Sequence, residues 1–187
     1  GVVWCNCPHM MGYDGVKVED LTKAEYEGRK RIYALVDWLR QKPLPGFEKC
    51  FVVDVAPQTG VRQTRLLDGE YVVTKEDVAD RVHFSDSVAR GRDYYTPYRA
   101  MLPRDVEQLI VAGRHYSATP AAQKSSREIP PCMAMGEAAG IAATMALQSG
   151  TSLRKIDVKA LQRKIHQAGG DPGDVPASNA KTLQAAE

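Results

Sequence analysis

Residues 125–146, SSREIPPCMAMGEAAGIAATMA, contain the strongest sequence signal for ligand binding. Proline is tolerated in the first turn of a helix because the N–H groups there have no partner within the helix, so Pro130 and Pro131 predict a helix start. The remaining unpaired N–H groups would point at whatever lies ahead of the helix, and the aligned peptide dipoles add about half a positive charge. This pattern predicts an anion-binding helix end.

The interior of the same helix is poor in large side chains. Gly136, Ala139, Gly140 and Ala143 recur at helical spacing on one face, where small residues allow close approach to a sheet or a ligand. Each glycine inside a helix costs about 1 kcal/mol relative to alanine, so close approach must compensate. A tightly packed core helix explains this segment equally well when it is considered alone.

The segment upstream favours the ligand-binding interpretation. QLIVAGR, Gln108–Arg114, is a compact apolar run that ends at a glycine, which predicts a parallel strand that feeds the loop before the helix. Ligands of open α/β sheets bind beyond the carboxyl ends of such strands. The strand and the helix would therefore meet at one site.

The N-terminal half contains patterns for a helix and several strands. Periodic apolar residues predict a helix over Leu21–Lys42, and a β-branched run predicts a buried strand over Cys50–Ala56. Asp68-Gly69 predicts a hairpin turn between two strands within Gly60–Val73.

Further along, Thr74 and Asp77 resemble a capping box that opens a short helix. Residues 81–95 are polar and predict irregular structure. An amphipathic helix is predicted over Val158–Gln167. The tail from Gly169 is rich in Gly, Pro, Asp and Ala, which indicates a chain that is flexible or ordered only against a partner.

Composition restricts the function classes. The 187 residues are 43% hydrophobic and 26% charged with a net charge of +2, values that are ordinary for a globular protein and argue against nucleic acid or a membrane surface as partner. No signal peptide or membrane span is evident, so a cytoplasmic location is expected. The chain begins at Gly1 without an initiator Met, which suggests a processed piece.

Four cysteines are present, and a C-x-C pair is formed by Cys5 and Cys7. We interpret the cysteines as free thiols in a reducing compartment. A zinc site at the pair is the less favoured alternative, since it would need two further ligands, one of which is His9.

The segment LIVAGRHYSATPAAQKSSREIPPCMAMGEAAGIAA resembles the C-terminal FAD-binding segment of FAD-dependent oxidoreductases related to the fumarate reductase and succinate dehydrogenase flavoproteins. The likeness extends upstream through LTKAEYEGR, LPGFE, GVRQTRLLDGEYVVTKEDV and PYRAMLP, and spans about residues 20–148. It implies an α/β fold, namely the C-terminal portion of a Rossmann-like FAD-binding domain and part of a mixed or antiparallel substrate domain.

The resemblance also implies a domain organisation. Residues 1–18 form an N-terminal extension that contacts a partner, residues 19–104 belong to a substrate or cap domain, residues 105–168 form the C-terminal FAD-binding segment, and residues 169–187 form a flexible tail.

Members of this family carry GxGxxG in an N-terminal half, and this sequence has no such motif after a strand; MGEAAG lies inside the predicted helix. The chain is therefore expected to be a small subunit or a fragment, completed by a larger chain that carries the GxGxxG half within a higher hetero-oligomer. Two alternatives are a non-catalytic scaffold subunit and a free-standing anion-binding module.

Nine residues match the family positions that bind FAD. They belong to the AGR turn near the ribityl chain or pyrophosphate, the loop beside the isoalloxazine ring, the helix start that faces the pyrimidine carbonyl, and the close-packing glycine of the helix: Gly113, Arg114, Ser126, Arg127, Ile129, Pro131, Cys132, Met133 and Gly136.

The resemblance implies hydride transfer from a substrate C–H bond to the flavin, with a base that removes a proton. His115 directly follows the AGR turn and is the candidate base, Arg99 is a candidate clamp for a carboxylate or enolate oxygen, and Tyr98 lies beside it. The structural alternatives are a hydrogen bond from His115 to a backbone carbonyl and core packing of Tyr98. Arg62 and Arg65 are interpreted as contacts to flavin phosphates or as surface ion pairs.

Overall fold

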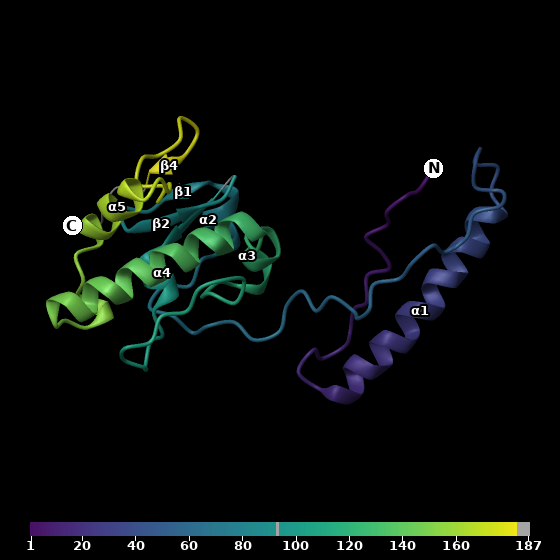
Figure 1. Ribbon diagram of the computed structural model, residues 1–187, viewed down its shortest axis with the longest axis horizontal. Coiled ribbons are helices and arrows are strands. Elements are labelled where there is room, and N and C mark those ends of the chain that lie inside the picture. Colours follow the sequence, from purple (N-terminus) through teal and green to yellow (C-terminus); the bar gives the residue numbers. More distant parts are fainter. Residues whose placement is uncertain (93, 183–187) are drawn as a thin grey trace. The chain divides into compact units, whose positions relative to one another are not determined.

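A computed structural model describes residues 1–92 and 94–182. The chain divides into two compact units, Gly1–Thr64 and Arg65–Glu187, and this boundary falls inside residues 19–104, the predicted substrate domain (Figure 1). Helices predominate and the sheets are small, which confirms the mixed α/β class. Among the described residues, no helix combines the length and apolar character that a membrane span requires.

The first unit is organised around one long helix, α1 (Val18–Arg40), close to the predicted range. Glu19 and Asp20 in its first turn and Arg40 in its last turn complement the helix dipole. Its apolar positions are only partly covered, and the buried residues of the helix are Ala24 and Gly28.

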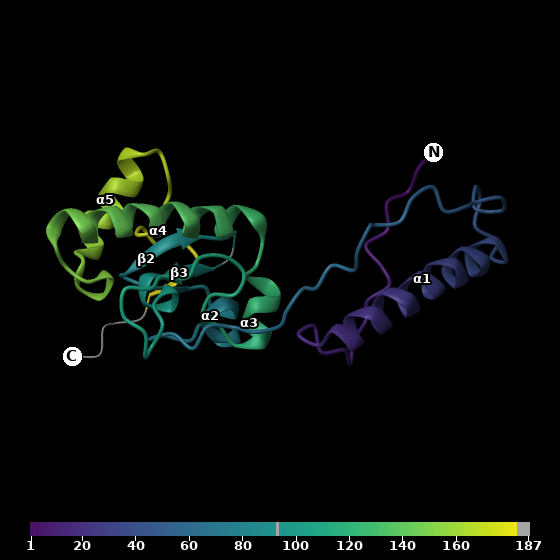
Figure 2. The ribbon, with the colours of Figure 1, turned by 60° about the horizontal axis from the view of Figure 1, so that its bottom comes forward.

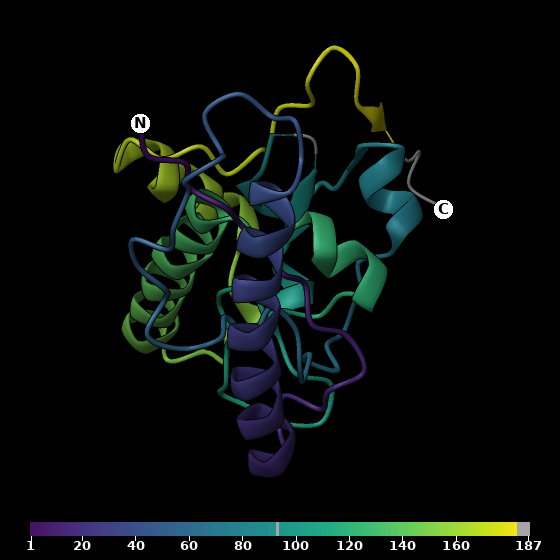
Figure 3. The same cartoon turned by 90° about the vertical axis from the view of Figure 1, so that its right-hand side faces the viewer.

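The chain that follows α1 returns along the helix, as Figures 1 and 3 show. Arg40 Nε donates to the carbonyl of Cys50 (2.8 Å), Arg29 Nη2 donates to that of Pro57 (3.2 Å), and Glu25 accepts from the N–H of Thr59. The strand predicted over Cys50–Ala56 is wrong: no strand is formed by residues 50–56, and no described strand pairs with them, while Arg40 of α1 bonds the carbonyl of Cys50. A β-branched run becomes a strand only where another strand lies beside it.

In the second unit, α4 (Ile129–Ser149) packs across the antiparallel pair β2 (Ser87–Arg90) and β3 (Tyr95–Pro97), as Figure 2 shows. The buried face of α4 consists mainly of small side chains, Ala138, Ala142 and Ala146, with the larger Met135 beside them. The helix ends at Gly150, whose φ of 65° is in the left-handed region. The helix start predicted at Pro130 and Pro131 is confirmed.

Residues 81–95 are more regular than their polar sequence predicts. They contain β1 (Val82–His83) and β2, and Ser87, Val88 and Ala89 are buried. The short strand β4 (Lys181–Thr182) pairs with β1 in parallel. The 3-10 turn η1 (Tyr98–Met101) follows β3 directly and leads the chain into the core.

The hairpin predicted within Gly60–Val73 is wrong. The N–H groups of Glu70 and Tyr71 donate to the carbonyls of Leu102 (3.0 Å) and Arg99 (3.3 Å), so this segment pairs with η1 and the chain after it. Gly69 is needed for close approach, since a Cβ there would lie 2.6 Å from Cβ of Ser117. The glycine in Asp68-Gly69 therefore serves packing and not a turn.

The parallel strand predicted over Gln108–Arg114 is also wrong. Val111 N–H donates to the carbonyl of Met101 (2.8 Å), but residues 108–114 belong to no strand, and Gln108 has a φ of 54°. Ile110 and Ala112 still pack against the core. The apolar run correctly indicates burial, whereas a ladder would need neighbouring strands that the described chain does not place beside it.

Two short helices and α5 complete the second unit. Thr74 and Asp77 form the predicted capping box at α2 (Lys75–Ala79), and α3 (Pro120–Ser125) is capped by Thr119. α5 (Val158–Gln167) has the predicted bounds, and its buried Gln162 donates to the carbonyls of Ser85 (3.0 Å) and Ser87 (2.8 Å) beside β2. The turn η2 (Leu153–Lys155) joins α4 to α5.

The tail predicted to be flexible over residues 169–187 contacts the body of the second unit. Pro172 is fully buried and its carbonyl accepts from the hydroxyl of Ser87 (2.7 Å), while the N–H of Ala177 donates to the hydroxyl of Tyr95 (2.7 Å). Residues 172–177 are thus held against β2 and β3 by their own chain. Residues 183–187 lie outside the described residues.

Arg154 of η2 holds the loop before Gln108. Its guanidinium pairs with Glu70 and with Glu107 (2.7 Å), and it donates to the carbonyls of Pro103, Arg104 (3.1 Å) and Val106 (3.1 Å). The side chain is only 20% exposed, so water replaces these bonds poorly.

We expect Arg154→Ala to lower the free energy of unfolding by about 2 kcal/mol, since several charge-assisted bonds are lost together. Arg163→Ala is the matched control: its ion pair with Asp157 is exposed and should contribute less than about 0.5 kcal/mol. Urea unfolding followed by far-UV circular dichroism makes the comparison, because both tryptophans, Trp4 and Trp38, belong to the first unit. Equal effects of the two substitutions would contradict this role.

Candidate functional site

The segment from Gly113 to Glu128 leads into the N-terminal end of α4, and this segment together with the first turns of α4 contains most of the predicted site residues. Gly113 has a φ of 109°, a conformation that L side chains rarely adopt, and its carbonyl accepts from the N–H of Tyr116 (3.1 Å). This turn places Arg114 and His115 at the surface and Tyr116 in the core.

Buried polar side chains brace the loop from within. The hydroxyls of Tyr116 and Ser126 lie 2.6 Å apart, and Ser126 donates to the carbonyl of Ala122 (2.8 Å). Gln123, 1% exposed, donates to the carbonyl of Arg114 (3.0 Å). Since each of these groups has a partner, the interior side of the loop is a satisfied hydrogen-bond network that fixes the loop against the core.

A second brace reaches the helix cap from β2–β3. The hydroxyl of Tyr94, a buried residue, donates to Oε2 of Glu128 (2.9 Å), and Glu128 is the N-cap residue of α4. Burial, and then the hydrogen bond to Glu128, raise the pKa of Tyr94 far above the ordinary tyrosine value. Tyr94 is therefore a fixed hydrogen-bond donor that positions the carboxylate beside the helix start.

The helix end offers fewer N–H groups than the sequence pattern predicts. Pro130 and Pro131 have none, and the N–H of Cys132 donates to the carbonyl of Glu128 (3.2 Å). Among the first three residues of the helix, Ile129 therefore supplies the N–H group that can point at a ligand. The dipole is unaffected by this, so the helix end still favours negative charge.

The outward face of α4 is apolar and uncovered within its unit. Ile129 is 76% exposed and Met133 is 70% exposed. Gly136 and Gly140 continue the same stripe at helical spacing, and a Cβ added at either would meet nothing within 4 Å. The close packing predicted for Gly136 is thus not made by any described residue of this chain.

Cys132 is half-buried in the first turn of α4. Burial, and next the carboxylate of Glu128, raise the pKa of its thiol, whereas the guanidinium of Arg114 opposes this change. Arg114 and Glu128 therefore lie within electrostatic reach of the same thiol.

The nine predicted FAD-binding residues divide into two sets. Ser126 and Pro131 are buried below the surface of the site. The other seven are exposed or half-buried on the loop and on the face of the helix: Gly113, Arg114, Arg127, Ile129, Cys132, Met133 and Gly136. His115 is exposed beside them, its ring next to Gly113.

Two predicted catalytic residues lie elsewhere. Tyr98 is buried and its hydroxyl donates to the carbonyl of Leu153 (2.9 Å), beyond the C-terminal end of α4, so it has the packing role. Arg99 pairs with Asp86 (3.5 Å) and stacks on Tyr71 (4.7 Å from the guanidinium carbon to the ring centre). The structure does not bring these two residues to His115.

Three residues of the site are absent from the predicted set of nine: Tyr94, Tyr116 and Glu128. Tyr94 and Glu128 are 34 positions apart, and no local pattern announces their hydrogen bond. Glu128, which precedes Ile129, could have been found from sequence, because acidic residues are favoured at helix N-termini.

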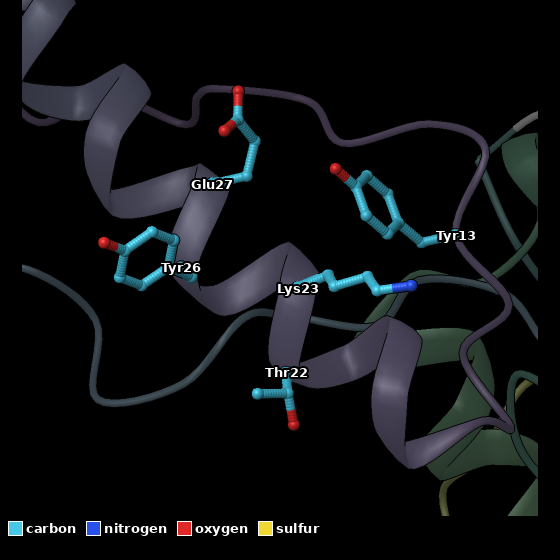
Figure 4. Close-up of a pocket in the computed structure, with 5 residues that line it drawn as sticks. All are labelled: Tyr13, Thr22, Lys23, Tyr26 and Glu27. Atoms are coloured by element: carbon cyan, nitrogen blue, oxygen red, sulfur yellow. The ribbon is translucent and has the colours of Figure 1, made fainter.

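Hollows on the surface lie away from this cluster. One of about 450 Å³ lies on α1, where Tyr13 lies over the side of the helix that carries Lys23 and Glu27 (Figure 4). Another of about 370 Å³ is lined by residues near the C-terminal end of α4, among them Met145 and Lys155. Neither contains a predicted site residue. Within residues 1–92 and 94–182, no three His, Cys, Asp or Glu side chains form a group suited to a metal ion.

The Tyr116 phenol is predicted to make stability depend on alkaline pH. Burial raises its pKa to about 12, above the ordinary value of 10.0, although the Ser126 hydrogen bond opposes the rise. The neutral phenol is therefore favoured in the folded state, and its contribution is complete below pH 10 and lost as the pH rises toward 12.

Tyr116→Phe should cost about 1 kcal/mol at neutral pH through the lost hydrogen bond, and this deficit should shrink above pH 10, since phenylalanine has no proton to lose. Ser126→Ala removes the same hydrogen bond but keeps the phenol, so its deficit should persist. Urea unfolding at a series of pH values tests both; a pH-independent deficit for Tyr116→Phe would refute the expectation.

One of the comparisons with known proteins supports the general family resemblance, namely to FAD-dependent oxidoreductases. The family model of FAD dependent oxidoreductases matches residues 2–92 and 90–165, which include parts of both units and the whole cluster at the start of α4. No curated protein and no solved structure shows a match to the chain. Because the family match spans most of the sequence, the chain belongs to the FAD dependent oxidoreductase family.

Proposed function

We propose that this chain supplies one side of the FAD site of an oxidoreductase, and that a polypeptide segment with a GxGxxG motif completes the site. The observation that carries this proposal is the uncovered face of α4. Ile129 and Met133 expose apolar side chains near the positive N-terminal end of the helix, and Gly136 leaves space for another group to approach the backbone. The loop beside them is held by buried hydrogen bonds.

The exposed set fits a flavin nucleotide on this side. Ile129 and Met133 offer apolar contact to a flat ring, Gly136 leaves room for close backbone approach, and Arg114 supplies a cation beside Cys132. Ser126 and Pro131 would hold the loop and the helix start without contacting the cofactor. The Rossmann-like character of the segment and its relation to fumarate reductase flavoproteins belong to the same proposal.

FAD, when bound, supplies the acceptor for a hydride from an organic substrate. The helix dipole of α4 and the guanidinium of Arg114 would stabilise negative charge near the cofactor. His115 would take the substrate proton, since it is exposed, adjoins Gly113, and is suited to base work near neutral pH. Arg99 and Tyr98 would act through the fold, because both are engaged by other residues of the unit.

The proposal is tested by purifying the protein from its native source without denaturant and recording the visible spectrum and the intact masses of what co-purifies. A yellow complex in which a larger chain carries GxGxxG supports a split FAD oxidoreductase in a hetero-oligomer. A single longer yellow chain that contains both halves supports the FAD site and refutes the split. A colourless complex supports an accessory subunit, and a colourless, well-folded monomer overturns the flavin proposal.

A more specific test of the proposed FAD contact is to add a single methyl group at Gly136 by substituting alanine. In the chain alone, Gly136→Ala and Gly140→Ala should each raise the free energy of unfolding by about 0.5–1 kcal/mol, because a Cβ meets no neighbour and alanine favours helix. In the flavin-containing protein, Gly136→Ala should weaken FAD binding by about tenfold, or about 1.4 kcal/mol.

Gly140→Ala is the matched control, since it lies one turn farther from the helix start and should retain FAD. Fluorescence of flavin released from each variant at equal protein concentration gives the comparison. Equal flavin retention by both variants would show that Gly136 does not approach the cofactor.

A further inference from the structure

The first unit carries a pair of nucleophilic side chains that the FAD site does not use. Cys5 and Cys7 are both free and exposed, with Asn6 between them. Cys50 and Cys132 are each half-buried and isolated in sequence. Two thiols separated by one residue and open to solvent can react in succession with the same molecule.

The spacing of the two cysteines along the chain is compatible with a disulfide between them. Residues two positions apart have Cα atoms separated by at most about 7 Å, and disulfides join Cα atoms about 4.4–6.8 Å apart. Asn6 is also anchored, since Nη2 of Arg62 donates to its Oδ1 (2.6 Å). The segment that carries the pair is therefore tied to the chain after α1.

The two thiols are not equivalent. Burial, and then the neighbouring Cys5 thiol through its charge and its hydrogen bond, raise the pKa of Cys7. The raised pKa favours the protonated form of the Cys7 thiol, so Cys7 is the sulfur expected to react second. This order gives an attacking and a resolving cysteine.

We propose that Cys5 and Cys7 form a thiol–disulfide exchange site that reduces small disulfides from solution, of the class of oxidised glutathione. The thiolate of Cys5 attacks one sulfur of the disulfide, the S–S bond breaks, and one thiolate leaves. Cys7 then gives its proton to solvent, its sulfur attacks that of Cys5, and the second thiolate leaves. Two electrons pass from the dithiol to the substrate, which becomes two thiols, and Cys5–Cys7 becomes a disulfide.

The test treats the full chain, fully reduced, with oxidised glutathione and locates the products by proteolysis and mass spectrometry. The wild-type peptide with both cysteines should lose two hydrogen atoms and retain no glutathione. Cys7→Ser should trap one glutathione on Cys5, because the resolving thiol is missing. Cys5→Ser should react more slowly than Cys7→Ser, since burial, the largest cause, still raises the pKa of the remaining Cys7 thiol.

Cys50→Ser is the matched control and should behave as the wild type, because that thiol is half-buried and contacts the carbonyl of Val36 (4.0 Å). Stable glutathione on both Cys5 and Cys7 of the wild type, or equal rates for Cys5→Ser and Cys7→Ser, would overturn the proposal. Neither outcome depends on flavin, so the result is independent of the proposed oxidoreductase function.

Discussion

The close approach of α4 to β2 and β3 is the constraint on which the second unit depends. Ala138 and Ala142 are fully buried at this contact, where any larger side chain would force the helix away from the sheet. Alanine buries little area, so the contact is strengthened by larger neighbours at its margins, namely Met135 on the same helix and Leu161 of α5. Because small residues fix this distance, they also fix where the N-terminal end of α4 emerges from the core.

The braced loop extends that rigidity to the surface. Tyr94 and Tyr116 lie in buried connecting segments, and their hydroxyls reach Glu128 and Ser126 on either side of Arg127. Residues that face outward are thereby positioned by hydrogen bonds that face inward. Such an arrangement suits a binding site, since the groups that contact a ligand are held before the ligand arrives.

The sequence predicts the helices well and the strands poorly, and the difference is physical. The signals for α4 and α5 are local, since proline, glycine, apolar period and cap residues act within a few positions. Residues 50–56, 60–73 and 108–114 have strand-like patterns, yet hydrogen bonding depends on which backbone lies beside them. In the structure, Cys50 is bonded by a side chain of α1, Glu70 and Tyr71 pair with η1 and the residue after it, and Val111 pairs with Met101. None of these partners belongs to a strand.

The same limit applies to the candidate site. The turn at Gly113 and the start at Pro130 are visible in sequence because backbone conformation is encoded locally, and in the structure Arg114 lies within electrostatic reach of the Cys132 thiol. Tyr98 and Arg99 follow a proline and look equally available, but the burial of one and the ion pair of the other are set by Leu153 and Asp86. Whether a side chain is free to contact a ligand therefore depends on tertiary contacts, which the local sequence does not reveal.

The first unit differs from the second in how little it buries. Within α1 only Ala24 and Gly28 are buried, while Trp4, Tyr26 and Phe51 are at least 70% exposed. A unit of 64 residues that folded alone would be expected to cover more of its apolar surface, since conformational entropy must be offset by burial. Large exposed apolar side chains on such a unit are typical of surface that contacts other protein surface. Each unit, taken by itself, therefore leaves open an apolar face of the kind that the proposed site, completed by another segment, would need.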